Sequence, residues 1–123
     1  MRSEEMIKLL PSGLREVLQK MNLDVAGLQE IRLRAEQPAV ILSHGKEYVS
    51  QTVIHRRQLE ETLAYLGNYS LYAYEEEIRR GYLSLPGGHR VGIAGRVVVD
   101  DGNIRTITAI SSLNLRFAHQ ILG

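Results

Sequence analysis

The first twenty residues carry their apolar side chains at helical spacing. Apolar residues recur at i, i+3 and i+4 in two stretches, 6–10 and 14–21, which are separated by Pro11. Proline is tolerated in the first turn of a helix, because the amide hydrogen that it lacks would have no partner there. We therefore predict two short amphipathic helices, and both must pack on the rest of the domain to be stable.

From residue 31 the apolar positions alternate with polar ones, which is the pattern of half-buried strands. The stretch 31–36 places Ile, Leu and Ala on one face, with two arginines and a glutamate on the other. Pro38 interrupts the pattern, and 39–42 and 47–49 follow as second and third strands with a turn between them. The sequence predicts a small β-meander.

Two central helices are expected next. The first runs from His55 to Leu66 with its leucines facing inward, and Gly67 is its expected C-terminal cap. Ser70 is a favourable N-cap for the second helix, which ends at Gly81. In this helix glutamates precede arginines by four residues, an arrangement that forms exposed ion pairs worth a few tenths of a kcal/mol each. The charged run is therefore interpreted as a solvated face.

The last third of the chain is rich in strands. Residues 100–103, Asp-Asp-Gly-Asn, are a strong hairpin signal. The final strand alternates, with every second residue from Leu113 to Phe117 on a face to be buried and with Asn114 and Arg116 opposite. The predicted strands are 82–85, 89–99, 104–110 and 113–117.

These elements predict a single α/β (α+β) domain. It has N-terminal helices, a small β-meander, two central helices and a C-terminal antiparallel, strand-rich part. The 123 residues suffice for one modest core. The chain has no cysteine, so disulfides and thiolate chemistry are excluded. No stretch approaches the roughly 20 apolar residues that cross a bilayer, and we expect a cytoplasmic protein.

The glycine-rich segment 87–96 does not match a phosphate-binding loop. Such a loop connects a strand to a helix and contains Gly-Lys-Ser or Gly-Lys-Thr, whereas this segment leads into three consecutive valines typical of a strand. Glycines in strands usually mark bulges or close approaches of the backbone. The alternative is a binding edge that carries His89, Arg90 and Arg96.

Apart from His89, the candidate residues for binding are arginines. No two of the four histidines have the i, i+4 spacing of a helical zinc site, and we expect neither a metal site nor a catalytic residue. A net charge of +1 is too balanced for a dedicated nucleic-acid binder. Arg32 and Arg34 share one strand face, and Arg116 lies on the polar face of the last strand. This surface is either a solvated sheet face or a site for an anion or a partner, because arginine binds carboxylate and phosphate bidentately.

Four segments, taken together and in order, resemble a known family. Residues 28–34 read Leu-Gln-Glu-Ile-Arg-Leu-Arg, and 70–82 contain Ser-Leu-Tyr-Ala-Tyr-Glu-Glu-Glu-Ile-Arg followed by Gly-Tyr. Residues 87–96 contain Gly-Gly-His-Arg-Val-Gly-Ile and Gly-Arg, and 110–116 read Ile-Ser-Ser-Leu-Asn-Leu-Arg. The set covers most of the chain. It resembles the N-terminal domain of the stage III sporulation protein AA family, whose full-length members look like secretion-type ATPases.

The resemblance implies that residues 1–123 form one N-terminal domain that precedes a P-loop ATPase core. The chain stops at Gly123 before any Walker A motif, so we expect this part to be no enzyme and to need no cofactor. The implied parent is an ATPase that uses ATP and Mg²⁺. The implied role of the domain is assembly and motor coupling in the engine that energises the channel complex between mother cell and forespore.

The resemblance also implies partners and a location. The partners are further copies of the chain in a ring, expected to be a hexamer, and the other stage III sporulation membrane proteins. The location is the mother-cell cytoplasm, peripheral at the outer forespore membrane and without a span of its own. Binding of nucleic acid is not expected.

The strand-rich last third also resembles the N-domain of type II and type IV secretion ATPases. In those rings N-domain arginines approach the nucleotide, where they stabilise phosphoryl charge. The alternative function is an RNA- or anionic-ligand-binding module that uses the arginine-bearing sheet face. The candidate residues for contact with nucleotide or a partner are Arg32, Arg34, His89, Arg90, Arg96, Arg105 and Arg116.

Overall fold

The computed structural model describes residues 3–8, 10, 12–23, 25–69, 74–100 and 103–118. The helices are α1 (Ser3–Lys8), α2 (Ser12–Met21), the 3-10 helix η1 (Val25–Gly27), α3 (Arg56–Gly67) and α4 (Tyr74–Arg80). The strands are β1 (Leu28–Arg34), β2 (Gln37–Ser43), β3 (Lys46–Ile54), β4 (Tyr82–Ser84), β5 (Arg90–Asp100) and β6 (Asn103–Arg116). The predicted α+β class is confirmed.

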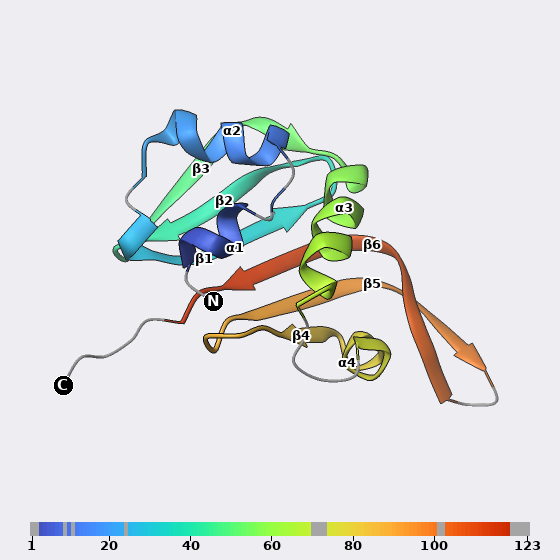
Figure 1. Ribbon diagram of the computed structural model, residues 1–123. Coiled ribbons are helices and arrows are strands. Elements are labelled where there is room, and N and C mark those ends of the chain that lie inside the picture. Colours follow the sequence, from blue (N-terminus) through green and yellow to red (C-terminus); the bar gives the residue numbers. More distant parts are fainter. Residues whose placement is uncertain are drawn as a thin grey trace.

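The strands form one six-stranded antiparallel sheet in the order β3-β2-β1-β6-β5-β4. Two meanders, β1 to β3 and β4 to β6, each pair neighbours in the sequence. The pairing of β1 with β6 joins them, from Glu30 opposite Arg116 to Arg34 opposite Ser112. The first and the last strand in the sequence therefore lie at the centre of the sheet (Figure 1).

One face of the sheet is covered by α1, α2 and α3 (Figure 1). All six strands and helices α2, α3 and α4 contribute buried apolar side chains to the core beneath them. Alternation of the strands sends Ile31 and Leu33 of β1 and Leu115 of β6 into this core, each at 0 % exposure. The polar residues between them lie on the opposite face.

We call this opposite surface the open face. The strand registers place the following residues on it: Glu47, Val49 and Val53 of β3; Pro38, Val40 and Leu42 of β2; Glu30, Arg32 and Arg34 of β1; Ser112, Asn114 and Arg116 of β6; Arg90, Gly92 and Ala94 of β5; and Tyr82 and Ser84 of β4.

The first predicted strand is shifted. It was expected over 31–36, but β1 ends at Arg34, and Glu36 has a φ of 61° in a tight turn. Pro38 was expected to break the sheet and instead lies inside β2. A register shift between Pro38 and Val40 accommodates it, because a bulge tolerates a residue that lacks an amide hydrogen.

The central helices differ from the prediction at their ends. Gly67 is the last residue of α3, and the C-cap is Asn68 with ordinary helical φ of −66°, so the predicted glycine cap is wrong. His55 is the N-cap, and its N–H donates to Gln58 Oε1 at 2.9 Å. The second helix, α4, begins at Tyr74, and the predicted cap at Ser70 lies outside the described residues.

The last two predicted strands are one continuous strand, β6. Ser111, which lies between the two predicted strands, stays in β6, and its Oγ donates to the Ala94 carbonyl at 3.2 Å. The irregularity is instead a bulge, with Ala109 at a φ of 45° and a register shift in β5 between Ala94 and Arg96. Beyond it, the far ends of β5 and β6 pair only with each other and project from the sheet (Figure 1).

The predicted inward face of the last strand is confirmed. Leu113, Leu115 and Phe117 are buried, and Phe117 extends the pairing with β1 by donating its N–H to the Gln29 carbonyl at 3.0 Å. Its ring meets the His89 imidazole edge-on, with 5.8 Å between the ring centres. Phe117 therefore closes the core where the two meanders meet.

We expect Phe117→Ala to lower the free energy of unfolding by about 3–5 kcal/mol, because it removes a buried aromatic ring and leaves a cavity. Urea unfolding followed by circular dichroism measures the change. Tyr65→Ala is the control, since Tyr65 is 51 % exposed and its truncation should change stability by no more than about 0.5 kcal/mol. An unchanged midpoint for Phe117→Ala would contradict the packing described.

Candidate functional site

The open face brings together charged side chains from opposite ends of the sequence. Glu30 on β1 lies opposite Arg116 on β6, and Arg116 lies opposite Arg90 on β5. In the neighbouring row, Arg32 on β1 lies opposite Asn114 on β6. Strand pairing therefore gathers predicted candidates that are far apart in the sequence.

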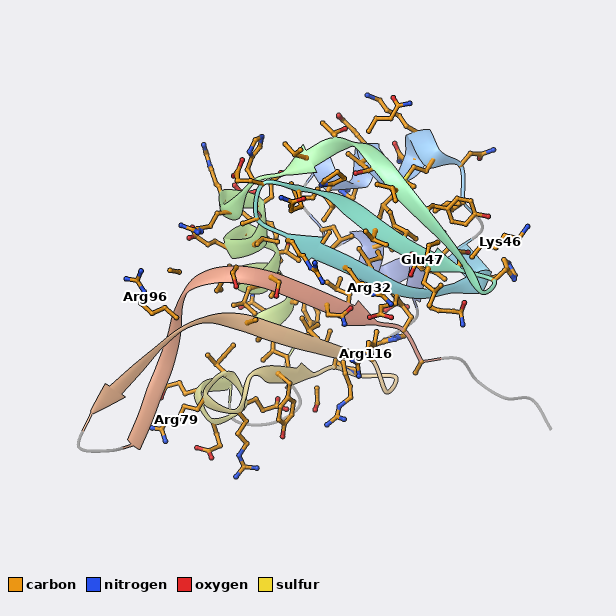
Figure 2. The ribbon with its side chains drawn as sticks, turned by 180° about the vertical axis from the view of Figure 1, so that it is seen from behind. Arg32, Lys46, Glu47, Arg79, Arg96 and Arg116 are labelled. Atoms are coloured by element: carbon orange, nitrogen blue, oxygen red, sulfur yellow. The ribbon has the colours of Figure 1, made fainter. Side chains whose placement is uncertain are left out.

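Arg32 is held between two carboxylates. Its Nε lies 3.3 Å from Glu30 Oε1, and its Nη1 lies 3.2 Å from Glu47 Oε1 on β3. Figure 2 shows Arg32 and Glu47 together on the open face, with Arg116 on the neighbouring part of the sheet. The hydrogen bond that Arg32 donates to Glu30, together with the negative charge of Glu30 and then of Glu47, raises the pKa of Arg32. The Arg32 guanidinium is thus already bound within the domain.

Glu30 is the most enclosed carboxylate of this group, with 16 % of its side chain exposed. Burial alone would raise its pKa, but hydrogen bonds from Arg32 and Asn114 outweigh that effect. The positive charges of Arg32 and Arg116 act in the same direction, so the pKa of Glu30 lies below its ordinary value. The side-chain oxygen of Asn114 is buried and has no hydrogen-bond partner among the described residues.

Arg90 and Arg116 form a contrasting pair. They are direct cross-strand partners and both are exposed, yet within the described part of the chain neither has a carboxylate within ion-pair distance. The Arg90 guanidinium lies over the ring of Tyr82, 5.1 Å from its centre, as in a cation–π contact. Like charges directly opposite each other on a sheet are unfavourable. Two exposed arginines therefore lie opposite each other in the pairing of β5 with β6.

The part of the open face on β2 and β3 carries exposed valines beside Glu47. Val49 of β3 is 61 % exposed and Val53 is 39 % exposed. A shallow hollow of about 240 Å³ lies between this apolar strip and the arginines. It is lined by Arg32, Arg34, Gln37, Pro38, Val40, Glu47 and Val49.

The remaining predicted candidates are not gathered at this surface. His89 is buried at 2 % exposure, and its Nδ1 accepts the Ala118 N–H at 3.0 Å. Its ring therefore belongs to the core and does not reach the open face. Arg96 lies on β5 at the base of the projecting hairpin, away from Arg32 and Arg116 (Figure 2). Arg105 lies on β6 within that hairpin, and its side chain is outside what the structure describes.

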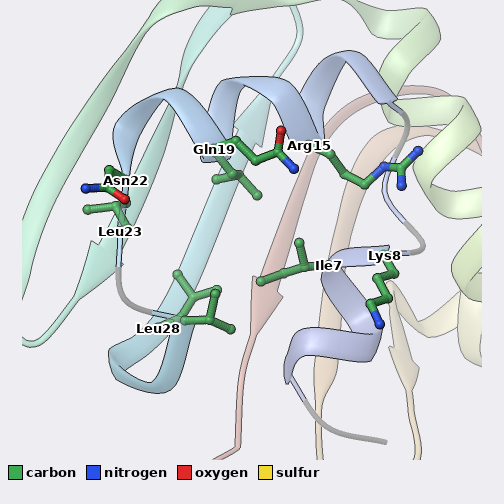
Figure 3. A pocket seen from close by; sticks show the side chains of 9 residues that line it. Ile7, Lys8, Arg15, Gln19, Asn22, Leu23 and Leu28 are labelled. Carbon is green, nitrogen blue, oxygen red and sulfur yellow. The ribbon is translucent and has the colours of Figure 1, made fainter.

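Sequence reasoning missed a second concave surface. A groove of about 490 Å³ lies between α1, α2 and the start of β1. Figure 3 shows Ile7, Leu23 and Leu28 in it, with Lys8 and Arg15 at one end. The two amphipathic helices before and after Pro11 were the available signal, but their spacing alone did not reveal that they leave a gap between them.

Two further observations bear on the chemistry. Among the described residues, no group of three or more His, Asp or Glu side chains is arranged to hold a metal ion. None of the helices in the described ranges is long and apolar enough to cross a membrane.

The fold and the open face define the class of this protein. It is an α+β domain in which a helix-covered core supports an exposed sheet face that carries arginines, two glutamates and exposed valines. The sequence profile described as "Sporulation stage III, protein AA" matches residues 1–123. The chain therefore belongs to the stage III sporulation protein AA family.

The chain is also similar to individual proteins. It is 32 % identical over 120 residues to "Stage III sporulation protein AA" of Bacillus subtilis (strain 168), a match that covers 97 % of this chain and 39 % of that protein. A solved structure, the VirB11 ATPase from the Brucella suis type IV secretion system in complex with sulphate, matches with a TM-score of 0.45 and 14 % identity. That match covers 98 % of this chain and 33 % of the VirB11 chain.

We expect Glu30→Gln to reduce stability at neutral pH by removing the carboxylate that binds Arg32. Because the folded-state pKa of Glu30 is lowered, its stabilisation is present above the ordinary glutamate pKa of about 4.3 and is lost as the pH falls through the folded value. The stability difference between wild type and variant should therefore shrink below about pH 4. Urea midpoints measured from pH 7 to pH 3 test this, and a difference that stays constant or grows on acidification would contradict it.

Proposed function

We propose that this chain is the assembly and motor-coupling domain of a secretion-type ATPase of the stage III sporulation protein AA family. In this proposal the full-length parent energises the channel complex between mother cell and forespore. The parent binds ATP and Mg²⁺ and forms a ring, expected to be a hexamer, at the outer forespore membrane. The other stage III sporulation membrane proteins are its partners there.

The observation that carries the proposal is the open face of this domain. The domain itself spans only about two fifths of the length of its Bacillus subtilis relative. The chain covers 39 % of the Bacillus subtilis protein. A sheet face with exposed Val49, Val53 and Arg34 offers both apolar area and charge to a second surface. Arginine is enriched among the residues that dominate binding energy at interfaces, whereas an exposed arginine contributes little to folding.

A second candidate function uses the same face. The direct opposition of Arg90 and Arg116 creates a local positive charge that an RNA phosphate or another anionic ligand could neutralise. Two carboxylates, Glu30 and Glu47, lie on the same face and oppose a polyanion. The salt dependence of RNA binding distinguishes the two functions. An affinity that falls steeply as the salt concentration rises would indicate binding to a phosphate backbone.

We expect the isolated chain to hydrolyse no ATP above background. Its sequence contains no Gly-Lys-Ser or Gly-Lys-Thr loop to hold the β- and γ-phosphates and place Mg²⁺. Phosphate release, measured at high protein concentration after two different purification routes, is the test. Turnover that follows the protein through both routes would refute the expectation.

We expect the double change Arg34→Ala and Arg90→Ala to impair the full-length parent without unfolding this domain. Both side chains are exposed, so the melting temperature of the isolated chain should change by only a few degrees. Oligomer size by light scattering and ATP turnover of the parent should both fall. Arg57→Ala on α3 is the matched control, because Arg57 is an exposed arginine outside the open face. A large loss of stability in the isolated domain, or a parent that assembles and turns over normally, would refute the proposed role of this face.

A further inference from the structure

The two edges of the sheet differ in how they are covered. At the β4 edge, the ladder bonds on either side of Ser84 face β5, so the Ser84 N–H points outward. The buried Glu77 carboxylate of α4 accepts this N–H, at 3.1 and 3.3 Å, and occupies the position that a further strand would need. At the other edge, β3 pairs only with β2 (Figure 1), and all its residues except Ser50 and Ile54 are exposed.

The β3 edge also carries exposed apolar side chains. In the described part of the chain, the exposed large apolar side chains are those of Tyr48, Val49 and Val53 on β3, and of Tyr65 and Tyr69. Val49 is the most exposed of them, at 61 %. Tyr48 and Val49 lie on opposite faces of the sheet, because side chains alternate along a strand. An unpaired edge with apolar side chains on both faces favours the addition of another strand.

The turn before β3 determines which backbone groups face outward. It has two residues, with φ of 49° and 76°, as in the tight hairpins whose flanking residues exchange both hydrogen bonds. Ser43 and Lys46 are that flanking pair, and hydrogen-bonded pairs alternate with free ones along the ladder. The N–H and C=O groups of Glu47 and Val49 therefore point away from β2, toward the free edge.

The regular part of this edge ends at Ser50. The Ser50 Oγ accepts the Ala39 N–H at 2.9 Å and donates to the Thr52 carbonyl at 2.7 Å, so a side chain replaces the backbone ladder there. The register shift between Pro38 and Val40 lies at the same place. A bulge of this kind stops strand pairing, so only residues 46–50 can accept another strand.

We propose that β3 pairs with β3 of a second copy of this chain, antiparallel and about a two-fold axis at Tyr48. The closed β4 edge leaves β3 as the edge through which two copies can join their sheets. A net charge of +1 on each copy gives little repulsion between them.

Only one register satisfies the outward-facing groups. Pairing Glu47 with Glu47 of the second copy would place like charges opposite each other. Pairing Val49 with Val49 would require a regular residue 51, which lies beyond the start of the bulge. Pairing Glu47 with Val49 needs only residues 46–50, and each of the two equivalent pairs exchanges both backbone hydrogen bonds. It also places Tyr48 opposite Tyr48 in the close, non-hydrogen-bonded position that suits aromatic pairs.

This inference goes beyond the proposed function and does not rest on it. A two-fold contact is isologous, whereas the subunits of a ring meet head to tail. The β3 contact is therefore separate from the contacts that would close a ring of the parent. The paired segment is short beside the about 20–30 residues that each side of a stable interface supplies, so we expect weak dimerisation of the isolated chain.

Disulfide trapping tests the contact and its register. The chain contains no cysteine, so an introduced cysteine can crosslink only to its counterpart in another copy. In the proposed register, Glu47→Cys in one copy lies opposite Val49→Cys in the other, with Cα atoms about 5.5 Å apart, which suits a disulfide. Two copies of the same variant hold their cysteines on a diagonal, at about 7–8 Å.

The crosslinking rate is measured in a glutathione redox buffer, with a mass tag on one of the two variants. We expect the mixed dimer to form at least about tenfold faster than the dimer of either variant alone, because only the mixed pair meets the geometry of a disulfide. Tyr65→Cys gives the background rate of random collision, since Tyr65 is exposed on α3 and away from this edge.

Charge variants test the same register without a crosslink. Val49→Glu and Val49→Lys remove the same valine, and both place the new charge opposite Glu47 of the second copy. We expect Val49→Glu to associate about tenfold more weakly than Val49→Lys, as followed by sedimentation velocity up to about 1 mM. The change in net charge from +1 acts in the opposite direction, so it cannot produce this result. Unchanged circular dichroism shows that both variants are folded.

Three outcomes would overturn the inference. The first is a mixed dimer that forms no faster than the Tyr65→Cys background. The second is crosslinking of Glu47→Cys or Val49→Cys alone at the rate of the mixture, which would assign another register or none. The third is association of Val49→Glu that is as tight as that of Val49→Lys. A wild-type chain that stays monomeric up to about 1 mM, together with the first outcome, would assign the β3 edge to a strand of a different protein.

Discussion

The antiparallel pairing of β1 with β6 is the contact on which the rest of this domain depends. Each of the two meanders needs only local turns, whereas the centre of the sheet forms only when the first and the last strand meet. Loop-closure entropy must be overcome before such a pairing becomes favourable, so this step should be late and cooperative in folding. The apolar residues beneath it, with Phe117 extending the ladder, supply the burial that offsets the entropy.

The same pairing creates the candidate site. Glu30 and Arg32 come from β1 and Asn114 and Arg116 from β6, and they become neighbours only in this register. A shift of one residue would turn Arg116 into the core and Leu115 out to solvent. The hydrophobic alternation that stabilises the core therefore also fixes the positions of the charges on the open face, although burial and charge recognition are different forces.

In our proposal, the open face is the part of this domain that contacts the rest of the assembly. In this proposal, a partner surface contacts both the arginines and the exposed valines of the same sheet face. The chain belongs to the stage III sporulation protein AA family and spans 39 % of the length of its Bacillus subtilis relative. In our proposal, the open face therefore contacts another part of the full-length protein or of its assembly.

The sequence by itself determined the α+β class, the number and order of most elements, the inward face of the last strand and the family, because these depend on periodicity and on short motifs. It misplaced the ends of elements at Pro38 and Gly67, where a bulge and an ordinary helical cap replaced the expected break and glycine cap. Only the tertiary structure decided that His89 is buried, that Arg32 is neutralised by two glutamates and that Arg90 and Arg116 are left together. The physical reason is that periodicity assigns a residue to a face, while its partners on that face come from strands whose register is set by long-range pairing.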